Sequence, residues 1–177
     1  MQSNHSTVTM NEIFDLNKTT LETFNGSGKV LCDNLIETGF NSLLFAYGQT
    51  GSGKTFTLLG NPGEANAKGL LTMCVDYLLA SEKTKKAIMS VVEVYGISAK
   101  SQSVFDLFEA QNVTGIDEWE KKKGEKTIAK PIKKKLTSDT DVGALILEVQ
   151  KAGLFITFSL SLSFEDVNVR WTAMVQM

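Results

Sequence analysis

Apolar residues recur along the chain at two spacings, one typical of helices and one typical of strands. Over residues 29–38 the apolar side chains return every three or four positions, and Gly39 follows as a helix stop. Residues 70–81 and 141–151 show helical patterns as well. A shorter helix is expected up to residue 59, where a turn rich in glycine and proline begins. The pattern therefore predicts four helices.

Two apolar segments have the character of strands, and a third is too short to assign. Residues 43–47 form an unbroken apolar run, which is typical of a strand buried on both faces of a mostly parallel sheet. Residues 87–95 are rich in β-branched side chains, and residues 104–108 form a short apolar segment after a polar loop. Because strands alternate with helices, the sequence predicts an α/β sandwich.

Composition and charge narrow the classes of function. The 177 residues carry a net charge of -2, so we expect no general attraction to nucleic acid. Cys32 and Cys74 match no metal-binding spacing, and we interpret them as reduced thiols. The polar first ten residues do not resemble a secretory signal, and no apolar run approaches the ~20 residues that cross a bilayer. We therefore expect a soluble, cytoplasmic protein without a membrane partner.

A phosphate-binding motif follows the apolar run directly. Residues 48–55 satisfy the pattern G-x-x-x-x-G-K-[ST] of a P-loop. Glycines let successive backbone N–H groups point at a phosphate, Lys54 can reach the β- and γ-phosphates, and the Thr55 hydroxyl can ligate Mg²⁺. The predicted nucleotide-binding residues are Gly48, Gln49, Thr50, Gly51, Ser52, Gly53, Lys54 and Thr55. No residue is assigned a catalytic role.

The residues around this motif resemble the signature of the kinesin motor domain family. Gly39-Phe40-Asn41 is followed at residues 45–57 by F-A-Y-G-Q-T-G-S-G-K-T-F-T, as in that family. Residues 92–95 and 104–108 are similar to two further family segments, so the resemblance covers most of residues 10–152 and is strongest at 39–60. It implies a three-layer P-loop NTPase sandwich of kinesin type, incomplete here, with helices on both faces of a mixed, mostly parallel sheet.

The resemblance also implies a function. In a kinesin such a P-loop binds ATP with Mg²⁺, and the motor moves along microtubules in the cytoplasm as part of the cytoskeleton. Two alternatives stay open: a non-catalytic kinesin remnant that at most binds nucleotide, and a different P-loop kinase or NTPase. The chain contains a single arginine, Arg170, which speaks against a small kinase with an arginine-bearing lid.

Other family motifs are missing from the sequence. The arginine-rich R-x-R-P, the switch I pattern N-x-x-S-S-R-S-H and the switch II pattern D-x-x-G do not occur. Because phosphoryl transfer is catalysed mainly by positioning and charge stabilisation, whether the chain is an ATPase is left open. We expect slow hydrolysis that microtubules accelerate little.

The charged segment at residues 113–140 predicts a lysine-rich hairpin. We interpret its lysines as a solvated surface, with contact to an acidic partner such as tubulin as the alternative. The cluster comprises Lys121, Lys122, Lys123, Lys126, Lys130, Lys133, Lys134 and Lys135.

The C-terminal part departs from the family. Residues 1–177 are interpreted as one partial motor domain that ends before switch I, with a weakly similar tail at 164–177. Residues 154–163 alternate serine with apolar side chains and have no family counterpart. We interpret them as an insertion, of which translated non-coding sequence is one source. The alternative is a genuine edge strand.

Overall fold

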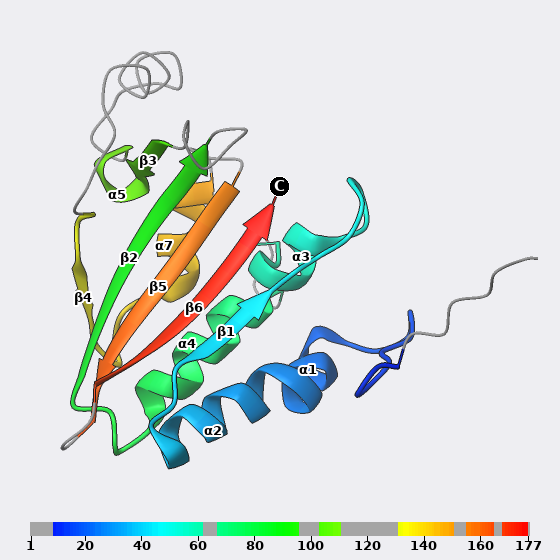
Figure 1. Ribbon diagram of the computed structural model, residues 1–177, viewed down its shortest axis with the longest axis horizontal. Coiled ribbons are helices and arrows are strands. Elements are labelled where there is room, and N and C mark those ends of the chain that lie inside the picture. Colours follow the sequence, from blue (N-terminus) through cyan, green and yellow to red (C-terminus); the bar gives the residue numbers. More distant parts are fainter. Residues whose placement is uncertain are drawn as a thin grey trace, which may run out of the picture.

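The computed structural model describes residues 9–61, 67–95, 103–110, 131–150, 155–164 and 168–176. Its strands form one sheet in the order β1-β6-β5-β2-β3, and β4 also pairs with β2. Figure 1 shows this sheet in front of the helices α4 and α7. The strands are β1 (Ser42–Phe45), β2 (Lys86–Tyr95), β3 (Ser103–Asp106), β4 (Lys134–Leu136), β5 (Phe155–Ser163) and β6 (Asn168–Gln176).

The four predicted helices are confirmed. They are α2 (Lys29–Thr38), α3 (Lys54–Leu59), α4 (Leu70–Ala80) and α7 (Val142–Gln150). Two short helices, α1 (Thr20–Thr23) and α5 (Leu107–Ala110), and the π-helical turn η1 (Phe24–Gly28) complete the set. Gly39 ends α2 in the left-handed region with φ 70°, and its N–H donates to the Leu35 carbonyl. Among the described residues no helix is long and apolar enough to cross a bilayer.

The sheet is mixed, as expected, but the balance of its pairings differs from the prediction. β1 runs parallel to β6. The other pairings of the described strands are antiparallel: β5 with β2 and β6, and β3 and β4 with β2. β5 and β6 are separated by only four residues, and so short a connection joins antiparallel neighbours. "Mostly parallel" is therefore wrong for the described sheet.

The described helices cover a single face of the sheet. α2 and α3 pack against α4, α4 packs against α7, and α7 packs against α5. On the covered face Met89 and Leu160 face each other and are buried, whereas Ile88 and Ser161 on the opposite face are only half-buried. The second helical layer expected from the resemblance is not seen among the described residues. The serines at alternate positions of β5 explain why this face tolerates water.

The prediction for residues 43–47 is wrong, and so is the edge-strand alternative for the serine-rich segment. The run at residues 43–47 is not buried on both faces: the side chains of β1 alternate between half-buried and exposed, and Phe45, 63% exposed, lies beside Met174, 41% exposed, on the face that the described helices leave uncovered. The serine-rich segment is not an edge strand, because β5 lies between β2 and β6. Leu160 is 1% exposed and belongs to the core.

α4 is the centre of the helical layer. Its residues Leu71, Cys74 and Leu78 are fully buried. The hydroxyl of Tyr77 donates to Asp33 Oδ1 at 2.7 Å, which ties α4 to α2. Cys32 and Cys74 are both free, as predicted, and both are buried. Hydrogen bonding to Cys32 together with burial raises the pKa of Cys74.

Candidate nucleotide-binding site

The predicted phosphate loop joins β1 to α3. β6 holds the end of β1 in place, because the Ala46 N–H donates to the Met174 carbonyl at 3.4 Å just before the loop. On the other side, Lys54 is the first residue of α3. All eight predicted nucleotide-binding residues therefore lie on one continuous strand–loop–helix segment, which Figure 1 shows between β1 and α3.

The loop backbone requires glycine at several positions. Gly51 and Gly53 have φ values of 79° and 88°, in the left-handed region that other residues rarely adopt. At Gly48 a Cβ would lie 2.6 Å from Ser52 Oγ, so a side chain there would displace Ser52. The Ser52 N–H donates to the Gln49 carbonyl at 3.2 Å and closes the turn. The glycines thus allow the loop backbone to adopt this compact conformation.

The ammonium group of Lys54 lies against the beginning of the loop. Its Nζ donates to the carbonyls of Gly48 at 3.0 Å and Gln49 at 2.8 Å. Lys54 and Thr55 are half-buried, whereas residues 48–53 are exposed. The loop therefore presents an accessible backbone with one positive charge fixed beside it, which is an arrangement suited to a phosphate chain.

The described residues offer few side-chain ligands for a metal ion at this loop. The described residues contain no group of three or more His, Cys, Asp or Glu side chains placed to hold a metal. Thr55 supplies one hydroxyl at the position where P-loop proteins ligate Mg²⁺. A Mg²⁺ ion that keeps several waters and binds through substrate phosphates is compatible with this sparse set.

Sequence comparison connects the whole segment to a family. The sequence model described as Kinesin motor domain matches residues 1–154. Kinesin-like protein KIP2 of Saccharomyces cerevisiae is 36% identical over 106 residues, which cover 55% of this chain and 14% of that protein. Kinesin-like protein KIF23 of Mus musculus is 44% identical over 69 residues, covering 39% of this chain and 7% of that protein. The chain thus spans a small part of these relatives.

Structural comparison agrees with the sequence. The crystal structure of the Drosophila kinesin family member Kin10/NOD in complex with divalent manganese and ADP superposes with a TM-score of 0.64 at 18% identity. The likeness covers 89% of this chain and 55% of that one, and at this identity it establishes the fold. The P-loop NTPase fold of kinesin type, predicted from the sequence, is confirmed. Since the family model matches most of its length, the chain belongs to the kinesin motor domain family.

Proposed function

We propose that this chain is the nucleotide-binding segment of a kinesin-like microtubule motor and that it binds ATP with Mg²⁺ through residues 48–55. The observation that carries the proposal is the loop geometry: two glycines with positive φ, and a lysine ammonium held beside them by two carbonyls. Backbone N–H groups of residues 48–53 would surround the phosphates, Lys54 would neutralise their charge, and Thr55 would contribute a metal ligand.

Relatives of known structure support the nature of the ligand and the partner. Drosophila NOD has been crystallised with manganese and ADP and also with AMPPNP. The same protein has been docked with bovine tubulin into a map of its complex with the microtubule. By analogy, we propose that a longer motor containing this chain acts on microtubules in the cytoplasm.

The proposal is tested by changing the charge at the loop. We expect Lys54→Ala to weaken binding of a fluorescent ATP analogue by about tenfold or more, since a hydrogen bond to a charged group contributes about 1.5–3 kcal/mol. Lys83→Ala removes an equally charged, exposed lysine in the turn after α4 and serves as the matched control. Equal affinities of the parent chain and Lys54→Ala would contradict the site assignment.

Binding without turnover is the second candidate function, because the switch I and switch II motifs do not occur in the sequence. Phosphate release measured with and without microtubules separates the two candidates. If the chain binds the ATP analogue but releases phosphate well below the ~10 per second of an ordinary enzyme, the result supports nucleotide binding without turnover. A faster, microtubule-stimulated release supports a working ATPase.

A further inference from the structure

The chain segments that leave α3 and enter α4 cross each other in direct backbone contact. Gly60, at the end of α3, forms an isolated antiparallel bridge with Lys68. Beside this bridge the Asn61 N–H donates to the Ala67 carbonyl at 2.9 Å. The crossing thus joins the helix that follows the phosphate loop to the central helix of the layer. We call it the neck, and it comprises residues 60–61 and 67–69.

The backbones in the neck pass too close to each other for a side chain at either of its terminal glycines. A Cβ at Gly60 would overlap with the Ala67 carbonyl oxygen, and a Cβ at Gly69 would overlap with the Leu58 carbonyl oxygen and the Leu59 carbonyl carbon. These are all backbone atoms, so no change of side-chain rotamer can relieve the overlap. Gly69 has a φ of -82°, which any residue can adopt, so the lack of space alone requires glycine there.

The neck is fixed to α4 from two sides. The ammonium group of Lys68 forms an ion pair with Asp76 of α4 at 2.8 Å. Leu59, the last residue of α3, and Leu70, the first residue of α4, are 2% and 4% exposed and belong to the core. The position of the end of α3 is therefore set by α4.

α3 connects the neck to the phosphate loop through its own hydrogen bonds. Lys54 is the first residue of this helix of six residues. The Thr57 N–H donates to the carbonyl of Gly53 in the phosphate loop at 2.9 Å, and the Gly60 N–H in the neck donates to the Phe56 carbonyl at 2.8 Å. A displacement of so short a helix at the neck therefore also displaces its other end, at the loop.

We propose that Gly60 and Gly69 are positioning residues for the nucleotide-binding site. By allowing the close crossing at the neck, they hold α3 where Lys54 and Thr55 can meet the phosphates and the metal ion. The two glycines touch no ligand and act through α3. This inference rests on the proposed function, because it gives the neck a part in the binding of ATP by residues 48–55.

Gly69→Ala tests the neck in the full chain. The added Cβ should push the end of α3 away from α4 and weaken binding of the fluorescent ATP analogue about three- to tenfold, which is part of the loss expected for Lys54→Ala. Gly143→Ala in α7 is the matched control, because a Cβ there meets only Asp141 Oδ1 at 3.4 Å and alanine is favourable in a helix. It should leave the affinity unchanged. Equal affinity of the parent chain and Gly69→Ala would overturn the proposal.

A double-mutant cycle separates positioning from a general loss of stability. If Gly69 acts through the position of Lys54, Gly69→Ala should weaken binding less than about twofold in a chain that already carries Lys54→Ala. An effect of full size in that background would overturn the proposal, because the effects of independent sites add.

Amide hydrogen exchange, measured without nucleotide, tests the neck independently of the proposed function. In Gly69→Ala the hydrogen-bonded amides of Ser52 and Thr57 should exchange at least about threefold faster, while that of Leu145 in α7 keeps its parent rate. Equally faster exchange at Leu145, or unchanged rates at all three, would overturn the proposal. If the parent chain does not bind the ATP analogue, the proposed function fails, whereas this exchange pattern still decides whether the neck positions the phosphate loop.

Lys68→Gln decides the question if circular dichroism shows that Gly69→Ala does not fold. The Lys68 side chain is 56% exposed, and its replacement removes the ion pair with Asp76 without creating an overlap. It should accelerate exchange in the phosphate loop and α3 and weaken binding of the analogue by about twofold, since an exposed ion pair contributes little. Lys83→Gln, in the turn after α4, is the control and should change neither quantity. Unchanged exchange in the loop and α3 of Lys68→Gln would then overturn the proposal.

Discussion

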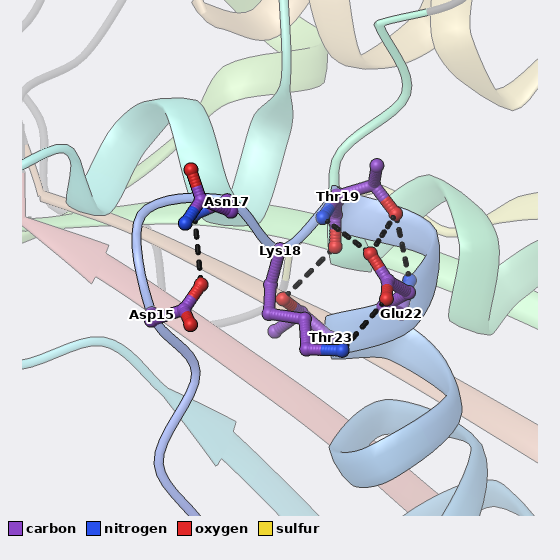
Figure 2. A network of polar contacts seen from close by, with 6 residues as sticks. All are labelled: Asp15, Asn17, Lys18, Thr19, Glu22 and Thr23. Atoms are coloured by element: carbon purple, nitrogen blue, oxygen red, sulfur yellow. Dashed lines mark hydrogen bonds and ion pairs between the residues drawn. The ribbon is translucent and has the colours of Figure 1, made fainter.

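At the scale of single residues, two carboxylates satisfy backbone N–H groups at the starts of short helices. Asp106 Oδ1 accepts from the N–H groups of Phe108 at 2.8 Å and Glu109 at 3.3 Å, and its other oxygen accepts from Ile132. Glu22 forms a capping box with Thr19 at the start of α1, as Figure 2 shows. The pattern T-x-x-E at residues 19–22 is a sequence signal for this box, which the sequence analysis missed.

The capping box predicts a pH-dependent start of α1. The ion-paired hydrogen bond from Lys18 and the hydrogen bonds from Thr19 lower the pKa of Glu22 to about 2. Because the pKa is lowered, the Glu22 carboxylate stabilises the first turn of α1 fully above its ordinary pKa of 4.5. This stabilisation is lost as the pH falls toward 2. NMR titration should therefore show the Thr19 and Glu22 amide signals moving together in that acid range. Glu22→Gln should abolish this transition, and a Glu22 midpoint near 4.5 would contradict the prediction.

At the scale of elements, helices were more predictable than strand neighbours. The apolar spacing located α2 and α4 to within one residue at each end, because helical periodicity is a local property. The same reasoning misplaced β1 and β5. An apolar run does not reveal that β1 has a described neighbour on only one side, and a serine–apolar alternation does not reveal that β5 has two. Pairing joins residues far apart in sequence, which no local pattern records.

The contact between α2 and α4 gives a prediction at this scale. Tyr77→Phe removes the hydrogen bond from the Tyr77 hydroxyl to Asp33, while Lys29 keeps its ion pair with the same carboxylate at 2.7 Å. We expect the free energy of unfolding to fall by about 1 kcal/mol in urea denaturation. The pKa of Asp33, lowered first by Lys29 and then by Tyr77, should rise. Tyr47→Phe, at a 94% exposed position, is the matched control and should change neither quantity.

An unchanged unfolding midpoint in Tyr77→Phe would contradict the prediction. It would show that the hydrogen bond to Asp33 in the folded protein is no more favourable than the hydrogen bonds that the hydroxyl makes to water in the unfolded chain. An unchanged pKa of Asp33 would show that the two groups do not interact in solution. Both readouts are needed, because the aromatic contact of Tyr77 with Phe24 is retained in the variant.

At the scale of the whole molecule, the phosphate loop depends on segments that the sequence could not connect to it. The motif located residues 48–55 because its chemistry is local. The strand that supports the loop is β6, more than 110 positions further on, which pairs in parallel with β1 from Ser42 to Phe45. β6 in turn is held in the sheet by β5.

This dependence makes the serine-rich segment a test of the fold. If β5 is an integral central strand, Leu160→Ala should lower the free energy of unfolding by about 2–5 kcal/mol, since Leu160 is 1% exposed between β2 and β6. Ser159→Ala, on the half-buried opposite face, is the matched control and should change it by no more than about 0.5 kcal/mol. Because β5 holds β6 and β6 holds the phosphate loop, Leu160→Ala should also weaken nucleotide binding at temperatures where the parent chain is folded. If neither Leu160→Ala nor Ser159→Ala changes the free energy of unfolding in urea, the result would instead support the interpretation of residues 154–163 as an insertion outside the folded core.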